Sequence, residues 1–200
     1  MDTPKQPPGY HLEQTSPGRL IFLNGASSSG KSTIATALQA TLEEPFWHIS
    51  IDHFREAGIL PLDRIRSGEF AWDLMRPKFF EGFHRCIPEL AAAGNNLIVE
   101  HIVETQEWMS LLKKLLKPFD VFYVGLHCPL AELLRREGAR TDKTRTEAGA
   151  DFEIVHRYMQ YDLELDSTRP VDQNVSALLK AWAERQSPPA SNGSDHQDPF

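Results

Sequence analysis

The residues with the clearest chemical meaning lie in NGASSSGKST, residues 24–33. Gly25, Gly30, Lys31 and Ser32 fit the pattern G-x-x-x-x-G-K-[ST], whose chemistry is the binding of a phosphate chain. The glycines let backbone N–H groups converge on an anion, and the lysine ammonium neutralises phosphate oxygens. The serine hydroxyl is suited to ligate Mg²⁺. The segment therefore predicts a phosphate-binding loop (P-loop).

The composition of this segment would also suit a flexible Gly/Ser linker, so the flanking segments are needed to distinguish a linker from a P-loop. The stretch before it, RLIFLN (19–24), has the nearly continuous apolar run that is expected of a strand buried on both faces. The stretch after it, from Lys31 to about Leu42, has a helical pattern. A strand, a loop and a helix in this order favour the P-loop. Its candidate nucleotide-binding residues are Gly25, Ala26, Ser27, Ser28, Ser29, Gly30, Lys31, Ser32 and Thr33.

Two acidic residues are predicted at the same edge of the sheet as the P-loop. Asp52 closes the second predicted strand, where a carboxylate could accept the proton of an attacking hydroxyl or hold a water of the Mg²⁺ shell. Alternatively, Asp52 caps the following turn. Glu100 ends the third predicted strand, so Ser32 and Glu100 are the candidate metal ligands. Local hydrogen bonding at a strand end is the alternative for Glu100 and its neighbours His101 and Glu104.

A basic segment, LAELLRREGARTDKTR (130–145), begins as an amphipathic helix. Arg136 and Arg140 are four residues apart, so on a helix they share a face, and an anionic ligand would relieve their repulsion. In small kinases a mobile lid supplies such arginines to the transferring phosphoryl group. The alternative is a solvated face on which Glu132 pairs with Arg136. The candidate catalytic residues are Lys31, Asp52, Arg136 and Arg140, and Arg136 is also a candidate for nucleotide binding.

The elements that must position these residues alternate along the chain. Apolar runs typical of strands cover 19–24, 47–51, 96–101, 121–127 and 161–166. Helical patterns cover 31–42, 74–93, 104–116, 130–138, 151–158 and 171–185. This alternation predicts an α/β fold: a three-layer sandwich with a central parallel sheet of about five strands and right-handed crossovers.

The bulk composition limits the class of protein. The chain has 200 residues, 40% of them hydrophobic, and a net charge of -7, which fits one globular domain without a broad surface for DNA or RNA. Cys86 and Cys128 lack the spacing of a zinc site and are expected to be reduced thiols. No signal peptide and no apolar run of ~18–20 residues is present, so no membrane association and a cytoplasmic location are expected. Residues 1–17 and 187–200 are expected to be disordered tails around a domain at 18–186.

These segments together resemble the chloramphenicol phosphotransferase family, P-loop kinases related in fold to shikimate and adenylate kinases. The resemblance covers about residues 20–168, and REGARTDK and YDLELDST are its most specific parts. It implies ATP-dependent phosphorylation of a small-molecule hydroxyl. Together with the candidate metal ligands Ser32 and Glu100, this makes ATP and Mg²⁺ the expected cofactors. The resemblance also implies a catalytic-base role for Asp52 and lid contacts for Arg136 and Arg140.

The acceptor is the open question. Between Asp52 and Glu100 the chain offers His53, Phe54, Arg55, Trp72 and Phe79, and aromatic residues at helical spacing are more often core than binding site. Other acceptors, such as a metabolite or a nucleoside, stay open. So does a nucleotide-binding module that hydrolyses or senses ATP without an acceptor, although such a module has no need of a base facing the acceptor.

Overall fold

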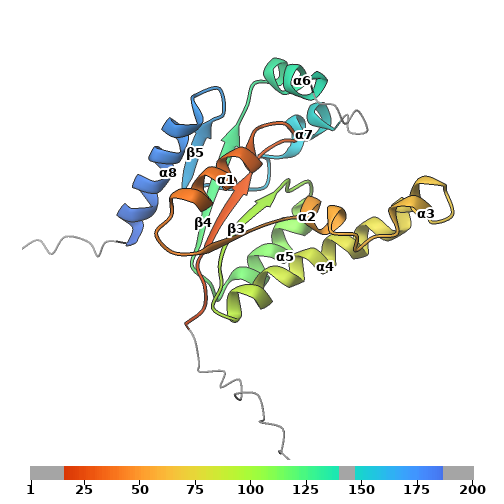
Figure 1. The fold of residues 1–200 in the computed structure, drawn as a ribbon, viewed down its shortest axis with the longest axis horizontal. Coiled ribbons are helices and arrows are strands. Elements are labelled where there is room, and N and C mark those ends of the chain that lie inside the picture. Colours follow the sequence, from red (N-terminus) through yellow and green to blue (C-terminus); the bar gives the residue numbers. More distant parts are fainter. Residues whose placement is uncertain (1–15, 140–146, 187–200) are drawn as a thin grey trace, which may run out of the picture.

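The computed structural model describes residues 16–139 and 147–186. Arg140 and the predicted tails, apart from residues 16 and 17, lie outside the described residues. Five strands form one parallel sheet in the order β2-β3-β1-β4-β5 (Figure 1). They are β1 Leu20–Asn24, β2 Phe46–Ser50, β3 Asn96–His101, β4 Val121–His127 and β5 Leu163–Asp166. The predicted α/β sandwich with a five-stranded parallel sheet is confirmed.

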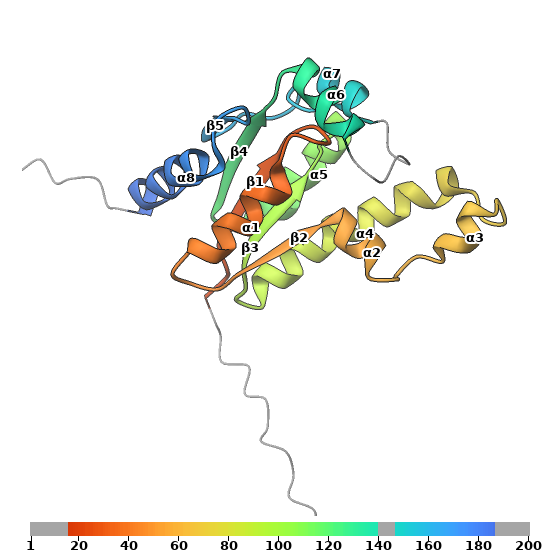
Figure 2. The same ribbon diagram turned by 45° about the horizontal axis from the view of Figure 1, so that its top comes forward.

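Helices cover both faces of the sheet. The helices of the described residues are α1 Lys31–Thr41, α2 Ile51–Glu56, α3 Leu62–Arg66, α4 Trp72–Ala92, α5 Gln106–Leu116, α6 Leu130–Gly138, α7 Ala148–Ile154 and α8 Val171–Gln186. Helices α1 and α8 lie on one face and α4 and α5 on the other (Figures 1 and 2). Helices α6 and α7 sit together beyond the carboxyl edge of the sheet (Figure 2).

The central strand β1 explains why two helical layers are needed. All five of its residues are buried, and alternate side chains point to opposite faces. Leu20 and Phe22 join the core beneath α4 and α5, whereas Ile21 and Leu23 join the core beneath α1 and α8. A strand with four consecutive apolar residues, all buried, is suited to a position between two such layers.

The register brings the ends of the inner strands to one edge. Asn24 at the end of β1 lies opposite His101 of β3 and Gly125 of β4. The Asn24 side-chain amide is buried and donates to the carbonyl of Val155 and to the hydroxyl of Tyr161, both at 2.7 Å. These bonds fasten the residue that precedes the P-loop.

The segment after β2 differs from the prediction. The strand ends at Ser50, whose hydroxyl accepts a hydrogen bond of 3.1 Å from the backbone N–H of His53 and caps α2. Asp52 therefore lies in the first turn of α2 and not at the end of the strand, and the helix cap is Ser50. The prediction missed α2 and α3 because helices of six and five residues show too few turns for a 3.6-residue period.

Both cysteines are free thiols, as expected: Cys128 is buried and Cys86 is partly buried. Across residues 16–139 and 147–186, no helix combines the length and the apolar character needed to cross a membrane.

Candidate active site

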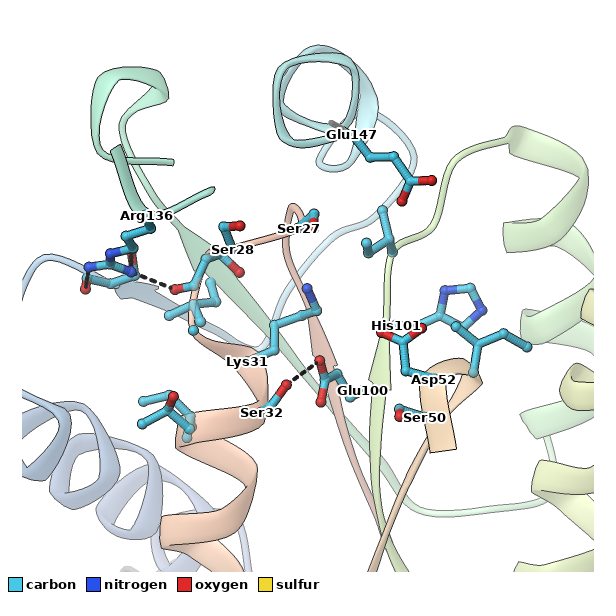
Figure 3. A pocket seen from close by; sticks show the side chains of 18 of the residues that line it. Ser27, Ser28, Lys31, Ser32, Ser50, Asp52, Glu100, His101, Arg136 and Glu147 are labelled. Atoms are coloured by element: carbon cyan, nitrogen blue, oxygen red, sulfur yellow. Dashed lines mark hydrogen bonds between the residues drawn. The ribbon is translucent and has the colours of Figure 1, made fainter. Parts of the chain in front are cut away.

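A cavity of about 1140 Å³ opens at the carboxyl edge of the sheet (Figure 3). The P-loop and the start of α1 line its centre. One arm runs between α2, α4 and the end of β3, and the other reaches the segment 167–171 and Asn174 of α8. A nucleotide phosphate chain at the centre would thus have space on both sides.

The P-loop backbone takes conformations that side chains rarely adopt. Gly30 has φ +98° and Ser28 has φ +64°, both in the left-handed region. A side chain at Gly25 would bring its Cβ within 2.7 Å of the carbonyl oxygen of Leu126. The hydroxyls of Ser28 and Ser29 are buried without a hydrogen-bond partner in the described part of the chain. Two such orphan donors suit a phosphate, whose oxygens accept hydrogen bonds.

Lys31 brings a positive charge into this loop. Its side chain is buried, and Nζ donates a hydrogen bond of 2.9 Å to the carbonyl oxygen of Ala26. An ammonium removed from water is costly unless anionic or polar groups surround it. A bound phosphate chain would supply such groups directly.

Ser32 and Glu100, the predicted metal ligands, are brought together. Ser32 Oγ donates to Glu100 Oε1 at 2.9 Å, and His48 Nε2 lies 3.0 Å from Glu100 Oε2. Burial would raise the pKa of Glu100, but the hydrogen bond with His48, the charge of Lys31 and the hydrogen bond from Ser32 outweigh it and lower this pKa. The ionised carboxylate and the hydroxyl are oxygen ligands of the kind Mg²⁺ prefers.

These two residues would not enclose the ion alone. No group of three or more His, Cys, Asp or Glu side chains among the described residues is arranged to hold a metal. Mg²⁺ usually keeps several waters and shares its remaining positions with substrate phosphates. The donor set therefore fits a metal that arrives with a nucleotide.

Asp52 reaches the same cavity from α2. It lines the cavity together with Lys31 and Glu100, and Figure 3 shows its side chain on the side opposite Arg136. Arg55 Nη1 lies 3.5 Å from Asp52 Oδ1, one turn further along α2. The half-buried Asp52 side chain is thus oriented by its own helix and open to a molecule in the cavity.

The arm beside Asp52 is walled by α4 and the loop after β3. Arg76 Nη2 bonds both carboxylate oxygens of Glu104, at 2.5 and 2.7 Å. The Arg76 guanidinium also lies over the rings of Phe80 and Trp108, with 4.5 and 5.3 Å to their centroids. Trp72 completes this wall.

Two aromatic residues from the sequence prediction lie elsewhere. Phe79 packs edge-on against Trp72 outside the cavity lining, and Phe54 packs against the buried Phe83. His101 borders the cavity but is almost fully buried, with its Nε2 2.7 Å from Nε2 of His84. Burial lowers the pKa of His101 to about 3 and that of His84 to about 4, so both rings are neutral at physiological pH.

Arg136 lies against the P-loop from the other side. Its Nη1 donates to the carbonyl oxygen of Ser29 at 3.1 Å, and its Nη2 donates to that of Ser167 at 2.9 Å. The ion pair with Glu132, which was the alternative expectation to a role in phosphoryl transfer, also forms, with 2.6 Å between Arg136 Nε and Glu132 Oε1. Arg136 therefore joins the P-loop to the segment that lines the second arm. Arg140, its predicted companion, is outside the described residues.

One residue at the loop was not predicted from the sequence. Asp151 of α7 is buried, and its Oδ2 accepts a hydrogen bond of 2.9 Å from the backbone N–H of Ser27. Asp151 belongs to no motif and lies 124 positions beyond Ser27. Only its position shortly after the basic segment 130–145 could have drawn attention to it.

A parallel sheet in this order, with a P-loop after its central strand, defines the fold of the small P-loop kinases. The APS kinase of Mycobacterium tuberculosis, solved with AMPPNP and APS, matches with a TM-score of 0.64 and 21% identity over 84% of this chain and 98% of that one. The shikimate kinase of Aquifex aeolicus matches with a TM-score of 0.57 and 21% identity over 83% and 97%. At these identities the likeness concerns the fold.

The sequence comparison is more specific. Residues 18–183 match the profile of the family described as chloramphenicol phosphotransferase-like protein, and the chain belongs to this family. Proteins from two strains of Mycobacterium tuberculosis, each with the provisional name O-phosphotransferase, are 30% identical over 195 residues, covering 88% of this chain and 87% of theirs. The expected family is confirmed, and the protein is a member of a phosphotransferase family with a P-loop kinase fold.

Proposed function

We propose that the protein transfers the γ-phosphoryl group of ATP to a hydroxyl of a small molecule, in the manner of a chloramphenicol 3-O-phosphotransferase. The observation that carries this proposal is that Asp52 lines the same cavity as Lys31 and Ser32 of the P-loop. The arm walled by Trp72 and Arg76 would hold the acceptor beside Asp52. The arm at Ser167 would hold the nucleoside.

The roles follow from the chemistry of each side chain. The P-loop amides and Lys31 would bind the β- and γ-phosphate oxygens and stabilise charge as the bond to the leaving ADP breaks. Asp52 would orient the acceptor hydroxyl and take its proton as the new O–P bond forms. Ser32 and Glu100 would hold Mg²⁺, which neutralises phosphate charge when it is bound. Arg136 would keep the loop aligned with the nucleoside arm.

An activity screen tests the proposal. The full chain is incubated with Mg²⁺-ATP and a panel of hydroxylated antibiotics, sugars, nucleosides and amino alcohols, and products are detected by mass spectrometry. We expect at least one compound to gain a phosphoryl group with matching release of ADP. Release of ADP that no acceptor increases would instead favour an ATP-hydrolysing or ATP-sensing module. Parallel reactions with GTP establish which nucleotide is the donor.

Glu100→Gln is expected to weaken the metal site selectively. The amide keeps the size of the side chain and one acceptor oxygen but removes the negative charge, and Mg²⁺ prefers carboxylates. We expect the Mg²⁺ concentration for half-maximal activity to rise about 10-fold, in the range typical of lost metal-site partners. Titration of Mg²⁺ at saturating ATP measures this. Glu107→Gln on the exposed start of α5 is the control. If Glu100→Gln has an unchanged Mg²⁺ requirement, Glu100 is not a metal ligand.

A further inference from the structure

The P-loop is held from outside by the pair of helices α6 and α7. Arg136 of α6 donates to the carbonyl oxygen of Ser29, and Asp151 of α7 accepts from the N–H of Ser27. The two helices are tied to each other because Glu137 Oε1 accepts a hydrogen bond of 3.0 Å from the backbone N–H of Ala148. The P-loop thus has one carbonyl and one amide that are hydrogen-bonded to this pair of helices.

The backbone N–H groups of Ser27 and Ser29 have separate partners. Ser27 N–H points to Asp151, whereas Ser29 N–H donates to the carbonyl oxygen of Ala26 at 3.1 Å. Between them, Ser28 is kept at φ +64°, which is a strained conformation for a residue with a side chain. Such a conformation persists only where neighbouring contacts hold the backbone in place. The hydrogen bond from the Ser27 N–H to Asp151 is such a contact, one residue before Ser28.

We propose that Asp151 is a positioning residue for nucleotide binding, which holds the first turn of the P-loop in the shape that receives the phosphates. This inference rests on the proposed function, because it concerns the nucleotide that the loop would bind. Asp151 acts through the Ser27 amide and need not touch the nucleotide. Nothing in the P-loop pattern requires an acid here.

Asp151 is buried, and burial disfavours the charged form of its carboxyl group. Burial raises its pKa to about 6; the hydrogen bond from Ser27 and the charge of Lys31 lower it, and the charges of Glu147 and Glu104 raise it. Because this pKa is higher in the folded chain than in an unfolded one, stability falls as the pH rises from about 4 through about 6. A buried carboxylate that destabilises the fold at neutral pH, yet bonds to the P-loop, fits a functional role.

Two variants separate positioning from charge. Asp151→Ala removes the acceptor for Ser27 N–H, whereas Asp151→Asn retains an acceptor oxygen in a side chain of the same size. We expect Asp151→Ala to weaken the binding of Mg²⁺-ADP and Mg²⁺-AMPPNP about 10- to 100-fold in titration calorimetry, the range for a lost hydrogen bond to a charged group. Asp151→Asn is expected to bind within about threefold of the unmodified protein, because the hydrogen bond is kept.

Stability is the second readout. We expect the melting temperature of Asp151→Asn to exceed that of the unmodified protein by about 3–8 °C at pH 8, with the difference disappearing toward pH 4. A purely structural Asp151 would instead make both variants less stable at pH 8. Glu153→Ala, an exposed change two residues along α7, is the control for damage to this helix.

The outcomes are distinct. If the unmodified protein binds no nucleotide, the proposed function fails. If it binds and Asp151→Ala binds equally well, or if folded Asp151→Asn binds as weakly as Asp151→Ala, the positioning role is wrong. Loss of affinity in Asp151→Ala with rescue in Asp151→Asn supports the role, and Asp151→Asn tests it even where the alanine variant does not fold.

Discussion

Lys31→Met is expected to lower the rate of phosphoryl transfer by about 10³-fold or more, the largest effect of any single change in the cavity. The reason is electrostatic: the ammonium is held in a buried loop, where a preorganised charge stabilises the phosphoryl group far better than it would in water. Methionine keeps most of the side-chain length and loses the charge. Steady-state ADP release with a phosphorylated acceptor, once the screen has found one, measures the effect.

The stability of this variant makes the result interpretable. Lys31 is a buried cation whose charge lowers the pKa of Glu100 and of Asp151. Methionine removes the cost of burying an ammonium and also the attraction to these two carboxylates, so we expect the two effects to offset each other and the melting temperature to change little. Lys113→Met on the exposed side of α5 is the matched control and is expected to retain full activity. Activity of Lys31→Met within about tenfold of the unmodified protein would contradict the phosphate-binding role of the loop lysine.

Asp52→Asn is expected to give the second largest effect, with a different signature. The amide cannot take the acceptor proton, and general-base contributions are typically about 10²–10⁴-fold, so kcat should fall by this factor. Asp52 lies on α2 beside the arm that we propose for the acceptor, so the affinity for Mg²⁺-AMPPNP should stay within about twofold of the original value. Single-turnover phosphoryl transfer measures the loss of rate, and calorimetric titration of the nucleotide measures the retained affinity.

A matched control lies on the neighbouring short helix. Asp63→Asn removes the charge of an exposed aspartate in the first turn of α3 and is expected to change neither quantity. If Asp52→Asn keeps full turnover, Asp52 is not the base, and an acceptor-independent nucleotide module becomes the better proposal. If it loses nucleotide affinity as strongly as turnover, Asp52 acts on the metal or the phosphates.

Local patterns predicted most of the scaffold because each depends on short-range chemistry. LIFL (20–23) is apolar at every position, as expected for a strand between two layers. The glycine and lysine spacing at 25–31 requires a tight turn before a helix. By contrast, α2 and α3 are too short to show a period, so the turn that carries Asp52 was placed at the end of a strand.

The sequence alone therefore indicated the parallel sheet and the P-loop, which follow from hydrophobic periodicity and from one contiguous motif. Its resemblance to the family rests on several segments spread over residues 20–168. The three-dimensional fold was needed for every contact between distant segments. Glu100 meets Ser32 across 68 positions, Arg136 meets Ser29 across 107, and Asp151 meets Ser27 across 124. The physical reason is that a hydrogen bond between distant segments depends on strand order and helix packing, which bring these side chains to one edge of the sheet. A local sequence pattern does not determine that packing.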